Sequence, residues 1–238
     1  IAQVSDLHNA VFGKDHAKLI HKLSECEPDI IVITGDLVDA ERTDLDAALD
    51  FAKGAVEIAD TYYVTGNHEA CLPQYGELQT ALERIGVIVL DDVSMQLEYH
   101  GERVMLIGLS DPDFTRKRDI LGEVSDLADA KLRELMGEED SYTILLSHRP
   151  ELFETYVSCG VDLVFSGHAH GGQFRLPFVG GLIAPNQGLF PKYDSGLYVD
   201  GGTSMVVSRG IGNSIIPFRF NNRPEIVLLV LHSDSNGR

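Results

Sequence analysis

The chain of 238 residues contains no tryptophan and only three cysteines. Cys26, Cys71 and Cys159 are odd in number and show no CxxC spacing, so a disulfide framework and a zinc site built from thiolates are disfavoured. No apolar run approaches the roughly 20 residues that a membrane-spanning helix needs. The hydrophobic content of 44% and the charged content of 24% are ordinary for globular proteins, so we expect a soluble domain.

Basic residues are also scarce: the chain contains 37 acidic and 19 basic residues, which give a net charge of −18. Nucleic-acid binders usually show the opposite balance, and the chain has no basic or aromatic-rich strip, so we expect no nucleic-acid partner. The same charge repels anionic phosphate esters at long range. If such an ester is the substrate, cations at the site must reverse the local field, which favours bound metal.

The length suits one α/β domain spanning residues 1–238, with no internal repeat or linker. The chain opens at Ile1, without a methionine and already inside an apolar strand pattern. We therefore expect that an N-terminal signal or anchor is missing from this sequence, and that any membrane attachment depends on that segment.

Short apolar strands alternate with helical patterns along the first part of the chain. Strands are predicted at 1–5, 30–33 and 61–64, with helices near 17–23 and 45–52 between them. Such units build a parallel sheet that binds ligands at the carboxyl ends of its strands.

The middle and the end of the chain follow a different pattern. Alternating residues at 95–99 and 104–108 predict a hairpin, so the sheets should be mixed. A helix over 120–132 and strands at 143–146, 161–165 and 226–231 complete the predicted elements. The glycine-rich segment 171–212 is predicted to fold back as the rim of an active site.

The stretch FSGHAHGGQ at 165–173 carries the clearest chemical signal. A buried strand runs into Ser166 and Gly167, and two imidazoles, His168 and His170, follow two residues apart. In extended backbone, residues at i and i+2 project to the same side, so both histidines can face one site. Two neutral imidazoles at a strand end suit a divalent metal.

Other predicted strands end in polar residues of the same kind. These residues are Asp6, His8, Asp36, Asn67, His68 and His148. Together with His168 and His170, they account for five of the nine histidines, and His16, His21, His100 and His232 are interpreted as ordinary surface or core residues. Mixed oxygen and nitrogen ligands without thiolate favour Mn, Fe, Zn or Ni over a structural zinc site.

The order D-x-H, G-D, G-N-H-E, H and G-H-x-H resembles the calcineurin-like metallophosphoesterase superfamily, and every block is intact. Segments 168–173 and 208–212 resemble its bacterial branch that includes YkuE and YaeI. The resemblance covers nearly the whole chain. It implies a four-layer α/β/β/α sandwich of two mixed sheets, and the branch implies a membrane-associated or exported setting.

The resemblance also implies a ligand set for two divalent or trivalent metal ions. One ion would take Asp6, His8, Asp36 and His170, and the other would take Asp36, Asn67, His148 and His168. Asp36 can bridge the two because a carboxylate has two oxygens. This arrangement implies hydrolysis of phosphomonoester, phosphodiester or pyrophosphate bonds by a metal-bridging hydroxide, on small-molecule, lipid-linked or cell-envelope phosphate esters.

Two further residues receive catalytic roles from the resemblance. His68, beside a ligand but not itself one, would protonate the leaving oxygen. Asp39 would orient His68, as in the phosphatase pattern GDxxD, or would instead cap a helix. That pattern continues with arginine where this chain has Ala40, which disfavours a phosphoprotein phosphatase.

Arg149, Arg175 and Tyr193 are candidates for contacting the substrate phosphate. Glu69 is interpreted as a residue that lies behind the ligands or belongs to the loop backbone. Three other interpretations of the pattern were weighed. The fold could be a catalytically silent metal-binding scaffold, although no ligand is missing. It could be a nuclease of the same superfamily, against which the charge argues. The third interpretation is a purely structural metal site. Such a site is usually closed and rich in cysteine, unlike the predicted set with its shared carboxylate and a nearby unassigned histidine.

Overall fold

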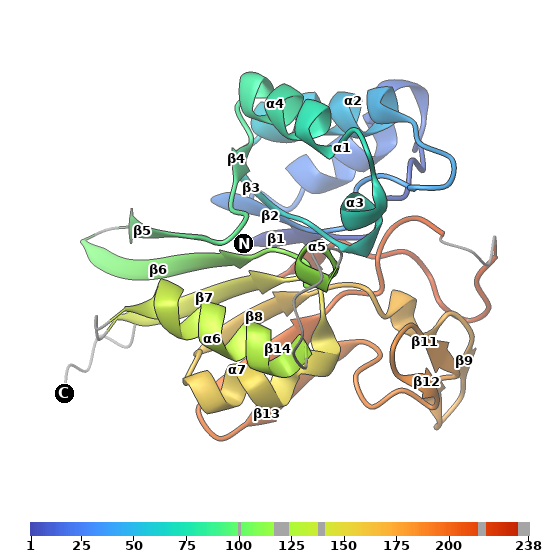
Figure 1. The fold of residues 1–238 in the computed structure, drawn as a ribbon. Helices are drawn as coiled ribbons and strands as arrows, with labels where there is room; N and C mark the ends of the chain where they lie inside the picture. Colours follow the sequence, from blue (N-terminus) through green and yellow to red (C-terminus); the bar gives the residue numbers. More distant parts are fainter. Residues whose placement is uncertain (100, 117–123, 138–140, 214–217, 233–238) are drawn as a thin grey trace.

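Two sheets stacked face to face form the centre of the molecule, and helices cover their outer faces (Figure 1). The computed structural model describes all residues except 100, 117–123, 138–140, 214–217 and 233–238. The predicted four-layer sandwich with mixed sheets is confirmed.

The first sheet has five strands in the order β15-β1-β2-β3-β4, with only β15 antiparallel to its neighbour. Its strands are β1 (Ala2–Val4), β2 (Ile30–Thr34), β3 (Asp60–Val64), β4 (Ile88–Val89) and β15 (Val227–Leu228). The helices that belong to it are η1 (Lys14–His16), α1 (Ala17–Ser24), α2 (Leu45–Val56), α3 (Asn67–Cys71) and α4 (Tyr75–Ile85). The predicted closing strand at 226–231 is thus shortened to the two residues of β15.

The second sheet has six strands in the order β13-β14-β8-β7-β6-β5. Its strands are β5 (Val93–Tyr99), β6 (Glu102–Leu109), β7 (Tyr142–Ser147), β8 (Leu163–Ser166), β13 (Gly196–Asp200) and β14 (Thr203–Val207). The helices beside it are α5 (Asp113–Arg116), α6 (Val124–Met136), η2 (Pro150–Leu152) and α7 (Phe153–Cys159). The predicted hairpin is confirmed as β5 and β6, whereas residue 100 and the predicted start of the helix at residue 120 lie outside the described residues.

Alternation along the strands distributes their side chains between two kinds of core. In β2, Val32 faces the space between the sheets, while Ile31 and Ile33 pack against the helices. In β7, Ile144 lies between the sheets and Leu145 packs beneath α6 and α7. Because both faces of these strands are buried, their sequences read as continuous apolar runs.

Two short hairpins lie beside the large sheets, next to the carboxyl ends of their strands (Figure 1). One pairs β9 (Arg175–Leu176) with β10 (Gly180–Gly181), and the other pairs β11 (Ile183–Ala184) with β12 (Gly188–Leu189). They follow the single turn η3 (His170–Gly172), which places them immediately after the histidine pair.

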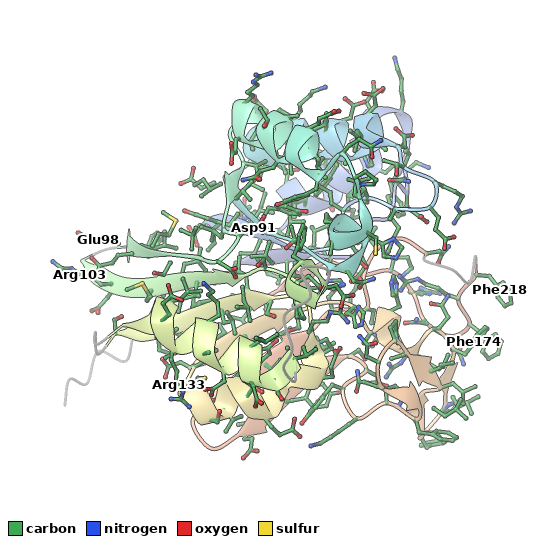
Figure 2. All side chains as sticks on the ribbon, in the orientation of Figure 1. Asp91, Glu98, Arg103, Arg133, Phe174 and Phe218 are labelled. Carbon is green, nitrogen blue, oxygen red and sulfur yellow. The ribbon has the colours of Figure 1, made fainter. Side chains whose placement is uncertain are left out.

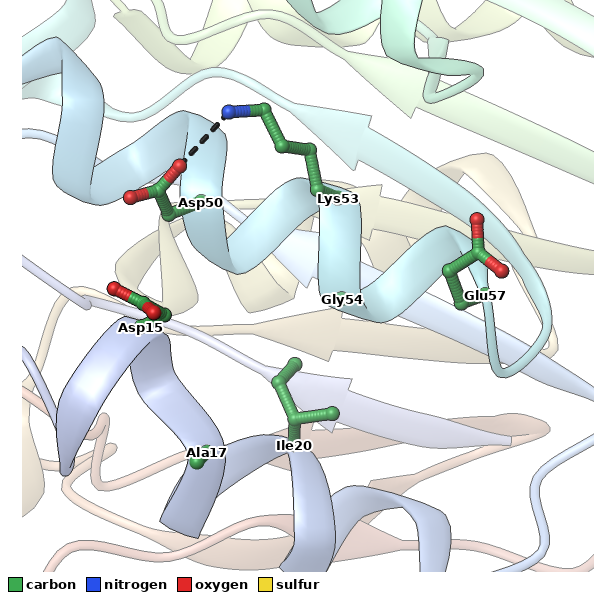
Figure 3. A pocket seen from close by; sticks show the side chains of 7 residues that line it. All are labelled: Asp15, Ala17, Ile20, Asp50, Lys53, Gly54 and Glu57. Carbon is green, nitrogen blue, oxygen red and sulfur yellow. Dashed lines mark hydrogen bonds and ion pairs between the residues drawn. The ribbon is translucent and has the colours of Figure 1, made fainter.

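A hollow on the outer helical layer lies between α1 and α2 (Figure 3). It is lined by Asp15, Ala17, Ile20, Asp50, Lys53, Gly54 and Glu57. Its one cation, Lys53, is paired with Asp50 at 2.8 Å, so the hollow offers no free positive charge to a phosphate. Within the described ranges, none of the helices combines the length and apolar character that crossing a bilayer requires.

Candidate metal centre

Side chains from the carboxyl ends of the central strands converge into two adjoining clusters. The first contains Asp6, His8, Asp36 and His170, and the second contains Asp36, His148 and His168. Within each cluster the potential ligand atoms lie within 4.8 Å of one another, and every member is buried. The structure therefore brings together six of the seven sequence-predicted ligands, with Asp36 in both groups.

The distances within the clusters fit the coordination of metal ions. In the first cluster, His8 Nε2 lies 3.1 Å from His170 Nε2 and 3.4 Å from Asp36 Oδ2. In the second, His148 Nε2 lies 3.2 Å from Asp36 Oδ2 and 3.1 Å from His168 Nδ1. Ligand atoms bound to one ion at about 2.1 Å lie about 3.0–3.4 Å apart. The same oxygen of Asp36 thus faces both clusters.

Asn67, the seventh predicted ligand, provides an independent test of this fit. Its Oδ1 is buried and has no hydrogen-bond partner. The next residue, His68, donates its backbone N–H to Asp36 Oδ1 at 2.9 Å, which places this turn against the shared carboxylate. A buried amide oxygen without a partner costs about 1–3 kcal/mol. A cation beside Asp36 would satisfy it, so the residues present fit a metal.

Burial keeps three of the imidazoles neutral and therefore able to bind metal. It lowers the pKa of His8 and of His170 to about 3, with the charge of Arg219 contributing at His170. Burial also lowers the pKa of His168 well below its usual value, helped by the charge of His148. At neutral pH each of these rings keeps one N–H and offers the lone pair of its other nitrogen to a metal.

Asp36 and His148 form a charged pair. Burial alone would raise the pKa of Asp36, but the charge of His148 and its hydrogen bond hold it well below the usual range. Burial opposes the charge on His148, yet Asp36 raises the pKa of His148 to about 10. The Nδ1–H of His148 donates to the carbonyl of Thr34 at 2.7 Å, which leaves Nε2 as the atom available to a metal. A cation between the two would displace the Nε2 proton.

Most of the predicted ligands occupy left-handed backbone. The φ angles are 54° at Asp6, 46° at His8, 51° at Asp36, 66° at His168 and 47° at His170. Such values are uncommon outside glycine, and they cluster at functional sites. The expectation of extended backbone at His168 and His170 is therefore wrong: the two rings turn apart, one toward His148 and the other toward His8.

Two glycines allow the loops after β2 and β3 to close on Asp36. A Cβ at Gly66 would lie 2.2 Å from Asp36 Oδ1, and a Cβ at Gly35 would lie 2.5 Å from His148 Nδ1. Gly35 also has a φ of 85°. The G-D and G-N-H blocks of the sequence thus reflect the close approach of backbone to ligand.

Glu69 supports these two loops from beneath. Its carboxylate accepts the backbone N–H groups of Gly66 at 2.7 Å, Asp36 at 2.9 Å and Val38 at 3.1 Å. The side chain is fully buried, and burial together with the charge of Asp36 raises the pKa of Glu69 to about 8. This position agrees with its predicted place behind the ligands.

We expect Glu69→Gln to lower the free energy of unfolding of the metal-free protein by about 1–3 kcal/mol, because an amide in place of Oε2 leaves buried N–H groups without an acceptor. Urea unfolding of the metal-free protein measures the change. The matched control is Glu57→Gln on the exposed side of α2, expected within about 0.5 kcal/mol of wild type. Equal losses in both variants would contradict the supporting role.

His68 and Asp39 lie at the edge of the first cluster. The ring of His68 meets that of His8 edge to face, with centroids 4.5 Å apart. Its Nδ1 accepts the backbone N–H of Ala40 at 3.1 Å and lies 4.0 Å from Asp39 Oδ1. Asp39 instead accepts the N–H groups of Glu41 and Arg42 and so holds a turn, while Asp44 caps α2. The orienting role of Asp39 stays a prediction.

Arg149 is buried behind His168. Its guanidinium binds both oxygens of Asp111, at 2.6 and 2.8 Å, and Asp113 at 3.0 Å. Its Nη1 lies 3.4 Å from His168 Nε2. These contacts occupy the guanidinium with Asp111 and Asp113, and they leave it close to His168. Contact of Arg149 with a substrate phosphate stays a prediction.

Arg175 and Tyr193 have structural partners of their own. Arg175 donates to Asp194 at 3.0 Å and to the carbonyl of Gly171 at 2.9 Å. The ring of Tyr193 packs against Phe153 in the core beneath the second sheet, and its hydroxyl donates to Glu154 at 3.0 Å. The structure does not bring Tyr193 to the clusters, and both predicted substrate contacts remain untested.

Two residues of the site were missed from the sequence. The side-chain amide of Asn186, between β11 and β12, lies 3.1 Å from His168 Nε2. Arg219 places Nη2 3.4 Å from His170 Nδ1 and is held by the carbonyls of Arg209 and Gly212. For Asn186 the only available signal was the glycine-rich character of 171–212, which predicted a rim but not which side chains reach inward. Arg219 lies beyond that segment, and no sequence pattern indicated it.

Comparison with known proteins identifies a family profile and a bacterial relative that match this chain. The family profile described as Calcineurin-like phosphoesterase matches residues 1–172. A protein of Bacillus subtilis described as uncharacterized metallophosphoesterase YkuE is 30% identical, over 98% of this chain and 79% of its own length. This similarity is consistent with the bacterial branch indicated by the sequence.

Solved structures share the fold at lower identity. The protein TT1561 of Thermus thermophilus superposes with a TM-score of 0.59 at 14% identity, over 88% of each chain. A dimetal phosphatase from Danio rerio gives a TM-score of 0.50 at 15% identity, over 88% of this chain and 86% of its own. These two likenesses concern the fold.

Proposed function

Since this chain belongs to the calcineurin-like phosphoesterase family and is a metal-dependent phosphoester hydrolase with a divalent metal centre, we propose that the centre holds two ions that share Asp36. The observation that carries the proposal is the position of Asp36 Oδ2, which lies 3.4 Å from His8 Nε2 in one cluster and 3.2 Å from His148 Nε2 in the other. Asp6, His8 and His170 would complete the first site. Asn67, His148 and His168 would complete the second.

Divalent ions in these positions supply Lewis acidity to the phosphoryl oxygens and lower the pKa of water. The protein itself contributes charged and polar side chains at fixed positions around the ions. Burial of the carboxylates and imidazoles excludes water from the ligands and strengthens their interaction with cations. The guanidinium of Arg219 adds positive charge on the His170 side, which favours an anionic substrate.

His68 supplies a proton to the leaving oxygen in this proposal. Because its Nδ1 accepts the N–H of Ala40, the neutral ring carries its proton on Nε2. The side chain remains 14% exposed, whereas the ligand side chains beside it are almost fully buried. A ring beside the ligands but open to solvent is placed to meet the substrate rather than the metal.

The proposed substrates are small or lipid-linked phosphate esters, including those of the cell envelope, in a membrane-associated or exported setting. The negative charge of the chain, −18, favours a small phosphate ester over a nucleic acid.

We expect metal-stripped protein to regain about two ions per chain, and to hydrolyse at least one ester, when supplied with Mn, Fe, Zn or Ni. The panel contains an aryl phosphate, a bis-aryl phosphodiester, a dinucleoside pyrophosphate and single-stranded DNA. Metal content is measured by mass spectrometry, and protein without added metal is the control. Two bound ions without turnover of any ester would indicate a silent scaffold, and turnover of DNA alone would indicate a nuclease.

A further inference from the structure

An exposed apolar surface lies beside the metal centre, on the two short hairpins and the segment 218–220. Its principal side chains are Phe178, Val179, Leu189, Phe190, Phe218 and Phe220, and we call this set the apolar rim. Each is at least 57% exposed, and Phe178, at the turn between β9 and β10, is completely so. Large contiguous apolar surfaces of this kind mark places where proteins or membranes bind.

Hydrogen bonds and ring contacts join these segments into one surface. The N–H of Arg175 donates to the carbonyl of Phe220 at 2.9 Å, and the rings of Phe174 and Phe218 meet with centroids 5.5 Å apart. Figure 2 shows Phe174 and Phe218 beside each other at the edge of the molecule. The N–H of Phe190 donates to the carbonyl of Leu182 at 2.9 Å, which extends the second hairpin by one residue on each strand. The N–H of Leu182 donates in turn to the carbonyl of Phe174 at 2.8 Å, which joins this hairpin to the segment before β9.

The charge of these segments is opposite to that of the rest of the chain. The sequence has no Asp or Glu in 163–193 or in 201–224, although the whole chain contains 37 of them. These two segments carry five cations: Arg175, Lys192, Arg209, Arg219 and Arg223. Three of these cations are paired with acidic side chains from outside the two segments, Arg175 with Asp194, Lys192 with Glu154 and Arg209 with Glu225. Among the described residues, Arg219 and Arg223 are the two without a salt bridge, and they add positive charge beside the apolar rim.

The apolar rim is built on the loops that hold the metal ligands. Asn186, in the turn of the second hairpin, contacts His168, and Arg219, between two rim phenylalanines, approaches His170. η3 leads from His170 directly into β9. Whatever covers the apolar rim therefore lies next to the metal centre.

We propose that the apolar rim docks this protein on the surface of a lipid bilayer, so that the metal centre faces phosphate esters held in that surface. The choice of substrate rests on the proposed function, whereas the docking does not. Phenylalanine and leucine side chains at hairpin tips can enter the boundary between headgroups and acyl chains. Arg219 and Arg223, which carry no salt bridge among the described residues, complement lipid phosphates.

Vesicle co-sedimentation tests the proposal, with vesicles of phosphatidylcholine and phosphatidylglycerol at a molar ratio of about 3:1. The rim variant is Leu189→Ser with Phe190→Ser, whose side chains are 68% and 63% exposed. The matched control is Leu197→Ser with Val199→Ser on the edge strand β13, both 64% exposed. Hydrolysis of a soluble ester, chosen from the panel above, is measured in parallel.

We expect wild type and control to sediment with the vesicles and the bound fraction of the rim variant to fall at least tenfold. All three should hydrolyse the soluble ester at the same rate. Wild type that stays in the supernatant, or a rim variant that binds like wild type, would overturn the docking. A wild-type dimer that becomes monomeric in the rim variant, without vesicle binding, would also overturn it. Rim-dependent binding without turnover of any ester would support docking while contradicting the hydrolase.

Discussion

Replacing Asp36 by asparagine is expected to remove both metal ions and to lower turnover of phosphate esters by at least about 1,000-fold. One oxygen of Asp36 faces His8 in the first cluster and His148 in the second. Asparagine keeps the shape of the side chain but loses the negative charge that two adjoining cations require. Metal content by mass spectrometry and turnover of the best substrate are measured on the same protein.

The control for this variant is Asp6→Asn. Asp6 belongs to the first cluster only, so this change is expected to reduce the metal content by one ion. Thermal unfolding in the absence of metal checks that both variants fold. Full occupancy of two ions in Asp36→Asn would show that this carboxylate does not bridge them.

His68→Ala is expected to keep both ions and to lose about 100- to 10,000-fold in turnover, as removal of a general acid usually does. His68 belongs to neither ligand cluster, yet its ring contacts that of His8. The loss should therefore appear in kcat rather than in metal content. Turnover with a substrate whose leaving group needs no proton, such as a nitrophenyl ester, should fall much less.

His21→Ala provides the matched control, because His21 lies on the exposed face of α1 and its side chain is 71% exposed. This variant should behave like wild type in both measurements. If metal-replete His68→Ala turns over as fast as His21→Ala on a substrate with a poor leaving group, His68 is not the proton donor.

The sequence predicted those parts of the fold that depend on local pattern. The apolar run at 30–33 became β2 because a strand buried between a sheet and helices needs apolar side chains on both faces. The alternation at 95–108 became the hairpin of β5 and β6. The ligand positions followed from a topological rule, since parallel strands place their carboxyl ends at one edge of a sheet.

The contacts that the sequence could not predict join residues far apart in the chain. Arg149 was assigned to a substrate because it follows His148, but Asp111, 38 positions away, binds its guanidinium. Tyr193 lies in the glycine-rich segment 171–212 and was predicted to contact the substrate, yet its ring packs against Phe153. Arg219 approaches His170 across 49 positions. No periodic pattern encodes such pairs, because each depends on how separate loops pack.

The left-handed backbone at five predicted ligands indicates that tertiary structure, and not local sequence preference, determines the geometry of this centre. Asp6, His8, Asp36, His168 and His170 would each favour another conformation in a short peptide. Their arrangement is imposed by the stacked sheets and by contacts between separate motifs, such as those of Glu69 with the backbone of Asp36 and Val38, and not by any single motif alone. Copying the motifs into a different scaffold would therefore transfer the amino-acid residues but not their coordination geometry. Remodelling the distant helices of this protein should leave that geometry unchanged.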